Sequence, residues 1–181
     1  MKILMIVGSL RKNSFNRQLA KMAEELIGDK AEVSYLEFSD VPFMNQDLES
    51  PVPAEIERVR DQVSQADGLW FFSPEYNHSY TGVLKNLLDW LSRPVVPGDY
   101  ASGTALAGKK AAISGVSGNS AAGFSREKLR ELLPFIKLEL LEAECGVALQ
   151  AESFQTDKLI LSDENKAELA AQAEAFMKFL S

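Results

Sequence analysis

The stretch from Leu69 to Pro94 constrains the fold of this chain most tightly. Four large apolar residues, Leu69 to Phe72, follow Gly68, and such a run is typical of a parallel strand buried on both faces. Further along, apolar residues recur at helical spacing until Pro94 ends the pattern. The sequence therefore predicts a strand, a polar loop and a helix. The loop lies at the carboxyl end of the strand, where open α/β sheets bind ligands.

The polar loop between this strand and this helix has a composition that suits a planar ligand. Pro74 limits the freedom of the backbone, Tyr76 offers a flat apolar face, and Asn77 and Ser79 supply neutral hydrogen-bonding groups. This mixture suits a ring rich in heteroatoms. An ordinary polar turn before a helix explains the same residues equally well, because turns favour Pro, Asn and Ser.

The amino terminus repeats the order of strand, polar loop and helix. Ile3 to Val7 form a predicted buried strand, and the helix that follows has Gly28 where a helix often ends. A helix amino terminus after a strand is a ready anion site, because unpaired N–H groups and the helix dipole point at the loop. The loop adds a fixed positive charge and three neutral donors, which are those of Arg11, Ser9, Ser14 and Asn16.

Phosphate binding accounts for this density of donors in the first loop. The alternative, in which Asn13 or Ser14 merely caps the helix, explains a single residue. No Gly-x-Gly-x-x-Gly follows the strand, so the usual dinucleotide fingerprint is absent. A mononucleotide is the better fit.

The remaining elements continue the alternation of strands and helices. Further strands are predicted at Glu32 to Phe38, Lys109 to Ser114 and Lys137 to Leu141. Helices are predicted after Pro53, from about Ser120 to Leu133, and after Ser162, which can cap the last one. Between residues 142 and 160 the pattern indicates no particular element.

This alternation predicts one flavodoxin-like α/β domain over residues 1–181. Its doubly wound parallel sheet has five strands in the order 2-1-3-4-5, with helices on both faces. In that order the loops after the first, third and fourth strands converge at one edge. The third of these loops is the small-residue stretch from Ser114 to Ser120.

Composition excludes several classes of function. A net charge of -7 argues against a nucleic-acid surface, which needs clustered Lys and Arg. The single cysteine, Cys145, can form neither an internal disulfide nor a cysteine-based metal site, and we expect it to pack near a strand in a reducing compartment. The apolar run from Ile3 to Val7 is too short for a signal peptide or a membrane span. We therefore expect a cytoplasmic protein with no membrane, nucleic-acid or metal partner.

These motifs together resemble the NADPH-dependent FMN reductase family, whose members include quinone, chromate and azo-dye reductases. One departure is Thr81, where the family commonly has Pro, which predicts a less rigid start of the following helix. The segments that carry the resemblance are Gly8 to Asn16, Asn45 to Leu48, Pro74 to Ser79, Gly82, Leu84 to Asn86, Asp89-Trp90 and Ser92-Arg93.

The resemblance implies a set of FMN-binding residues. Around the phosphate it places Ser9, Arg11, Ser14, Phe15 and Asn16. Along the isoalloxazine it places Pro74, Glu75, Tyr76 and Asn77, and on the other side of the ring Ser114, Gly115 and Val116. A helix-capping role for Glu75 is an equally open reading. No side chain is expected to act as a general acid or base.

The same resemblance implies an FMN-dependent NAD(P)H oxidoreductase with NADPH or NADH as co-substrate. Hydride would pass through bound FMN in ping-pong fashion to quinones or similar small acceptors, such as chromate, azo dyes or free flavin. It also implies a homodimer or homotetramer with the helix after Pro74 to Ser79 near the interface. The alternative is a flavodoxin-type FMN electron carrier that serves a protein partner.

Overall fold

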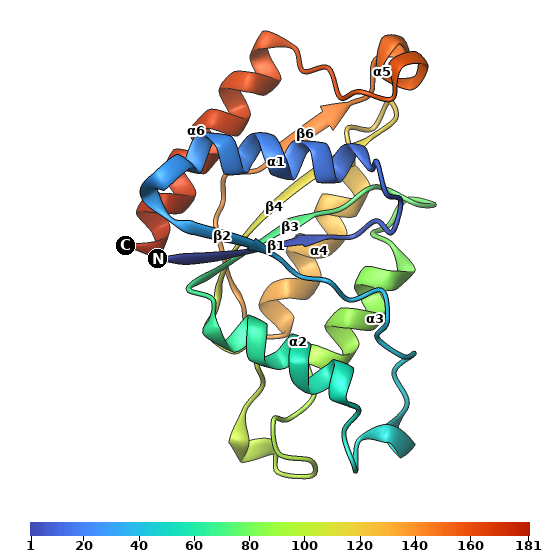
Figure 1. The fold of residues 1–181 in the computed structure, drawn as a ribbon, viewed down its shortest axis with the longest axis vertical. Helices are drawn as coiled ribbons and strands as arrows, with labels where there is room; N and C mark the ends of the chain where they lie inside the picture. Colours follow the sequence, from blue (N-terminus) through green and yellow to red (C-terminus); the bar gives the residue numbers. More distant parts are fainter.

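A parallel β-sheet lies at the centre of the computed structural model, which describes residues 1–181 (Figure 1). Its strands are β1 (Lys2–Val7), β2 (Glu32–Tyr35), β3 (Gly68–Phe72), β4 (Lys110–Ser117), β5 (Glu139–Leu140) and β6 (Cys145–Ala148). Their order is β2-β1-β3-β4-β5, with β6 also paired to β4. The predicted flavodoxin-like order is confirmed.

Helices cover both faces of the sheet. One face is covered by α1 (Phe15–Ile27) and α6 (Asp163–Leu180), and the other by α2 (Ala54–Gln65), α3 (Gly82–Leu91) and α4 (Gly123–Phe135) (Figure 1). A short helix, α5 (Ala151–Thr156), follows β6. Two apolar cores result, one on each side of the sheet. None of the helices is long and apolar enough to cross a membrane.

The unbroken apolar sequence of β3 is explained by these two cores. Leu69 and Phe71 pack into the core beneath α2, α3 and α4, whereas Trp70 and Phe72 pack into the core beneath α1 and α6. All four side chains are fully buried. Because successive side chains of a strand point to opposite faces, only a strand covered on both faces can bury such a run.

The sheet has six strands instead of the predicted five. The strand expected from Lys137 to Leu141 is reduced to the two residues of β5, which pair with the start of β4, and β6 then pairs with the end of β4. Between the two, the amide of Gln172 donates to the carbonyls of Ile113 (2.8 Å) and Ala143 (3.0 Å). The strand pairing along the outer side of β4 is therefore interrupted between β5 and β6, where the Gln172 side chain from α6 takes its place. Two strands this short produce no readable periodicity.

Several predicted boundaries also shift. β2 ends at Tyr35 although a strand to Phe38 was expected, and β4 continues to Ser117 instead of stopping at Ser114. α4 begins at Gly123 and not near Ser120, because the backbone before it takes a left-handed conformation at Ala121 and Ala122 (φ 50° and 58°). α4 also continues past the predicted end at Leu133, through Pro134 to Phe135. The cap of the last helix is as predicted, since Ser162 Oγ accepts from Asn165 N at 3.1 Å.

Cys145 lies within β6 and is fully buried, which confirms the expected packing near a strand. Burial raises the pKa of the thiol to about 12. The thiol is therefore protonated at neutral pH, and the thiolate that reacts with oxidants or metals is not formed there.

Gly115 in β4 lies close against the end of β3 and the residue that precedes α4. A Cβ atom at this position would lie 2.6 Å from Ala122 Cβ and 2.6 Å from the carbonyl oxygen of Ser73. The carbonyl belongs to the backbone and cannot move aside without disturbing the end of β3. We expect Gly115→Ala to lower the free energy of unfolding in urea by about 1–3 kcal/mol, the usual cost of overpacking.

Gly118→Ala is the matched control for this prediction. A Cβ atom at Gly118 would meet no heavy atom within 4 Å, so its cost should stay within about 0.5 kcal/mol. Equal effects of the two substitutions would show that the close approach at Gly115 does not constrain the fold.

Candidate functional site

The loops after β1, β3 and β4 meet around a cavity of about 430 Å³, which we call the central cavity. Most of the residues proposed from the sequence line it, namely Ser9, Arg11, Ser14, Phe15, Asn16, Pro74, Glu75, Tyr76 and Val116. The lining also includes Ser117 and Gly118, which belong to the predicted third loop, and three residues that the sequence did not single out, which are Leu149, Phe154 and Asp157. Leu149, Phe154 and Asp157 come from the stretch where the sequence pattern indicated no element.

The first loop ends at the capped amino terminus of α1. Ser14 Oγ accepts from Asn16 N at 3.2 Å, so the helix-capping reading of Ser14 is correct. Capping does not exclude anion binding, because a helix start leaves further N–H groups unpaired and carries the positive end of the helix dipole. Ser9 Oγ accepts from Arg11 N at 3.4 Å, which leaves its own hydroxyl proton free to donate.

Asn16 has a structural task that the sequence did not reveal. Its buried amide donates to Val116 O at 3.0 Å and accepts from Val116 N at 2.9 Å. The side chain thereby ties the start of α1 to the end of β4. Its oxygen is occupied by this contact, and one of its two N–H protons remains for a ligand.

Arg11 is the one cationic residue that lines the central cavity. Its guanidinium lies over the Phe15 ring, 5.2 Å from the ring centroid, and its Nη1 donates to Asn13 O at 2.8 Å. Its Nη2 forms an ion pair with Asp157. Hydrogen bonds from Asn13 and then from Arg11 hold the pKa of Asp157 below its usual range, so this carboxyl is charged at neutral pH.

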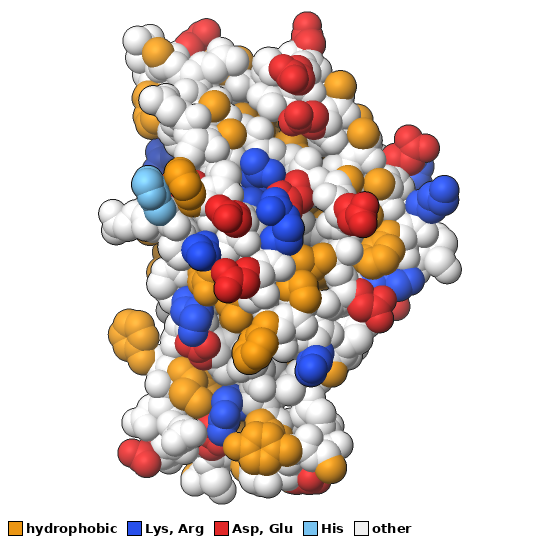
Figure 2. All heavy atoms as spheres, turned by 180° about the vertical axis from the view of Figure 1, so that it is seen from behind, with side chains coloured by type: hydrophobic (Ala, Val, Ile, Leu, Met, Phe, Trp, Pro, Cys, Tyr) orange, Lys and Arg blue, Asp and Glu red, His pale blue; other side chains and the backbone are white.

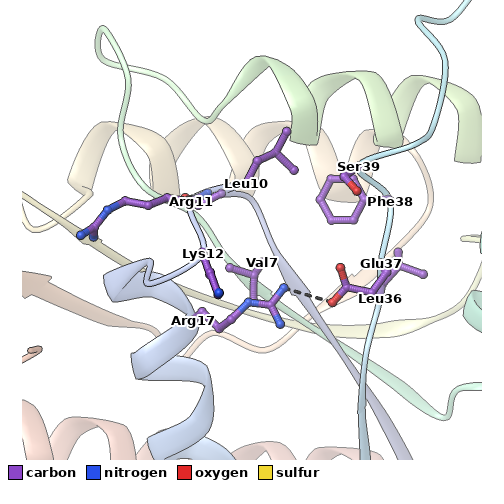
Figure 3. Close-up of a pocket in the computed structure, with 10 residues that line it drawn as sticks. Val7, Leu10, Arg11, Lys12, Arg17, Leu36, Glu37, Phe38 and Ser39 are labelled. Atoms are coloured by element: carbon purple, nitrogen blue, oxygen red, sulfur yellow. Dashed lines mark hydrogen bonds and ion pairs between the residues drawn. The ribbon is translucent and has the colours of Figure 1, made fainter. Parts of the chain in front are cut away.

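A second cavity, of about 320 Å³, lies at the ends of β1 and β2 (Figure 3). There Arg17 reaches Glu37 at 3.1 Å, so its charge is already paired. Figure 3 shows that Arg11 extends away from this pair. The central cavity is therefore the better candidate for an anionic ligand, since Arg11, the α1 amino terminus and the loops of three strands lie together there.

The loop after β3 presents an exposed aromatic ring and a tight turn. Tyr76 is 57% exposed. The backbones of Tyr76 and Ser79 exchange hydrogen bonds of 2.9 and 3.2 Å, with Asn77 and His78 between them in left-handed conformation (φ 52° and 59°). Asn tolerates this conformation better than most residues. Asn77 does not line the central cavity, and the turn is sufficient to explain its presence.

His78 lies at the tip of this turn and stacks on Phe124 of α4, with the ring centroids 4.0 Å apart. Figure 2, which views the molecule from behind, shows the single histidine at the edge of this face beside an apolar side chain. The turn after β3 is thus held against α4.

Glu75 caps a helix. Its Oε2 accepts from Phe124 N at 2.9 Å and from Ser125 N at 3.4 Å, in the first turn of α4. The residue at the N-cap position, Ala122, has no side chain that could do this. The capping reading is correct, and it joins the loop after β3 to the start of α4.

Ser114 and Gly115 do not line the central cavity, because β4 continues beyond them. Ser114 is fully buried, where its hydroxyl accepts from Trp70 Nε1 (2.9 Å) and donates to Gln172 Oε1 (2.8 Å). Val116, Ser117 and Gly118 occupy the cavity wall instead. The predicted small-residue loop from Ser114 to Ser120 contains this wall, whereas the three residues that the resemblance implied, Ser114 to Val116, begin two positions before it.

Thr81 stands at the position where the family resemblance led us to expect proline. Its Oγ1 donates to Gly8 O at 2.7 Å and accepts from Leu84 N at 3.4 Å, and the residue is buried. Proline could form neither bond. The looser helix start that we expected is therefore not observed, because the hydroxyl caps α3 and ties it to the first loop.

Comparison with known proteins agrees with this geometry. The pattern of the NADPH-dependent FMN reductase family matches residues 1–150. An NAD(P)H:quinone oxidoreductase of Solanum tuberosum is 36% identical over 178 residues, which cover 94% of this chain and 88% of that protein. A quinone reductase of Pseudomonas putida is 32% identical over 180 residues, which cover 98% of this chain and 94% of that protein.

A solved structure shows the same arrangement. FerB of Paracoccus denitrificans, a flavoenzyme NAD(P)H:(acceptor) oxidoreductase, superposes with a TM-score of 0.85 and is 29% identical. The superposition covers 99% of this chain and 96% of FerB. The length of the family match and the identity to relatives of nearly the same extent lead to one conclusion: this chain belongs to the NADPH-dependent FMN reductase family.

Proposed function

We propose that this protein is an FMN-dependent NAD(P)H oxidoreductase that reduces quinones or similar small acceptors. The observation that carries the proposal is the central cavity, where a helix amino terminus and Arg11 lie at one side and the exposed ring of Tyr76 at another. Family membership supports the cofactor, and the names of the relatives support the acceptor class. When bound, FMN supplies the redox chemistry, since it accepts hydride from a nicotinamide and passes electrons to an acceptor.

The residues of the central cavity fit this cofactor. Ser9, Arg11 and the N–H groups at the start of α1 would hold the phosphate, through donors that are free for it. Pro74 to Tyr76 would line one side of the ring and Val116 to Gly118 the other. Gly115 lets these two walls approach, because nothing larger fits between Ser73 and Ala122.

The protein's part in the reaction is orientation. The carboxylate of Glu75 is engaged by α4, and that of Asp157 by Arg11 and Asn13. Neither lining carboxylate is therefore left as a free acid or base, and the nicotinamide and the acceptor would use the same open ring in turn. The one cysteine is reduced and buried, which fits a cytoplasmic reductase.

Anaerobic mixing tests the proposed function against the electron-carrier alternative. NADPH should bleach the flavin of the purified holoprotein within seconds, because a reductase reacts with the nicotinamide directly. Initial rates with a soluble quinone should then give parallel double-reciprocal lines. A flavin that stays oxidised until a reductase partner is added would show that the protein is a carrier.

Arg11→Ala tests the phosphate end of the site. We expect FMN to bind about tenfold more weakly or worse, since charge-assisted hydrogen bonds contribute about 1.5–3 kcal/mol. Riboflavin, which lacks the phosphate, should bind to the variant as it does to the parent. Lys12→Ala, which removes a neighbouring positive charge outside the central cavity, should leave FMN affinity within about twofold. Equal losses in the two variants would indicate general charge attraction only.

We also propose that the protein assembles into a homodimer or homotetramer through the end of the molecule formed by two loops. These are the loop between β2 and α2 and the loop between α3 and β4. The loop between β2 and α2 packs along α3, since Asn86 accepts from Met44 N (2.7 Å) and Trp90 donates to Pro42 O (2.8 Å). Exposed apolar side chains gather there, and Figure 2 shows apolar groups toward this end. They belong to Phe43, Leu48, Val95, Val96 and Tyr100. An exposed patch of this kind is typical of an interface.

Light scattering after gel filtration tests this assembly. The double substitution Val96→Asp with Tyr100→Asp should lower the molecular mass, because two buried charges per subunit would oppose association. Leu26→Asp, which places a charge at an exposed apolar residue of α1 on the other face of the sheet, should leave the mass unchanged. An unchanged mass in the double variant would place the interface elsewhere.

A further inference from the structure

Asp157 lies at the phosphate side of the central cavity, and neither the sequence motifs nor the family resemblance includes it. It follows α5 and receives three side chains from the first loop and α1. Its carboxylate pairs with Arg11 and accepts from Asn13 Nδ2 at 2.6 Å. Its backbone carbonyl accepts from Asn13 Nδ2 at 2.9 Å and from Gln18 Nε2 at 3.1 Å.

The position of Asp157 does not depend on Arg11. Its backbone is left-handed (φ 56°) and is held by Asn13 and Gln18, and Gln18 Oε1 in turn accepts from Leu159 N at 2.7 Å. Phe154, in the same segment, packs edge-on against Phe15 with ring centroids 6.1 Å apart. These contacts therefore fix the position of the Asp157 carboxylate beside the first loop.

Stability alone is a poor explanation for this ion pair. The side chains of Arg11 and Asp157 are 50% and 45% exposed, and exposed pairs usually contribute little to folding. The pair does restrict Arg11, which is now held by Asp157, by Asn13 O and by the Phe15 ring. A guanidinium has five N–H donors, so several remain available for a ligand.

We propose that Asp157 is a positioning residue that holds the guanidinium of Arg11 toward the phosphate of FMN. The inference rests on the proposed function. An arginine ordered before binding loses little freedom when the ligand arrives, which strengthens binding. Repulsion between the carboxylate and the phosphate works in the opposite direction, but water and salt screen it at this exposed rim. We therefore expect the positioning effect to exceed the screened repulsion.

The test compares FMN with riboflavin on the full chain stripped of flavin. Asp157→Asn is the variant, because Asn removes the charge, keeps the shape and tolerates the left-handed backbone. Flavin fluorescence titration should show FMN bound roughly five- to tenfold more weakly and riboflavin bound as before. In an Arg11→Ala background the same substitution should have no further effect on FMN, since the residue through which Asp157 acts is gone.

Asp163→Asn serves as the matched control, because Asp163 also forms an exposed ion pair, with Lys166, at the start of α6. It should change neither affinity. Tighter FMN binding in Asp157→Asn would show that the carboxylate competes with the phosphate, and equal weakening of both flavins would show a general structural role. Either result, or an unchanged FMN affinity, overturns the inference. If Arg11→Ala itself leaves FMN affinity unchanged, the proposed phosphate site fails as well.

Discussion

Parallel pairing of β1, β3 and β4 is the constraint on which the rest of this structure depends. Val7 pairs with Phe72 and Phe72 pairs with Ser114, so the ends of these strands are in register. The ladder continues one step into the loops, since Gly8 N donates to Phe72 O and Ser73 N donates to Ser114 O. Both faces of the strands pack into apolar cores, so a shift in register would disturb close packing on both sides of the sheet. The central cavity forms because the loops after β1, β3 and β4 begin next to one another at the same edge of a rigid sheet.

Polar side chains then join these loops in pairs. Asn16 ties the first loop to β4, Thr81 ties α3 to the first loop, and Glu75 ties the loop after β3 to α4. Each satisfies a backbone group near the cavity that would otherwise lack a partner, so the loss of any one leaves an unpaired group as well as a loose loop. Loops that are held in this way keep the cavity open without a ligand, which lowers the cost of ordering them on binding.

The charges at the cavity suit a single phosphate in a protein of net charge -7. Arg11 is the one cation of the lining, and the two carboxylates there are occupied, Glu75 by the amino terminus of α4 and Asp157 by Arg11 and Asn13. The amino terminus of α1 remains as the second positive element. A phosphate monoester can be held by such a set of groups without a surface rich in Lys and Arg, which an acidic chain does not offer.

The sequence by itself determined the fold class, the strand order and the two loops, after β1 and β3, that line the central cavity. These depend on local patterns, such as the apolar run of β3 and the donors that precede α1. Such patterns can be read from a short segment without knowing which distant residues it contacts. Only the tertiary structure decided the extent of β4, the division of the edge between β5 and β6, and the place of Asp157. Each of these depends on a partner far along the chain: Asn16 for Val116, Gln172 for Ile113, Arg11 for Asp157. Contacts between such distant residues leave no periodicity in the sequence, because the geometry that joins them arises only when the sheet has formed.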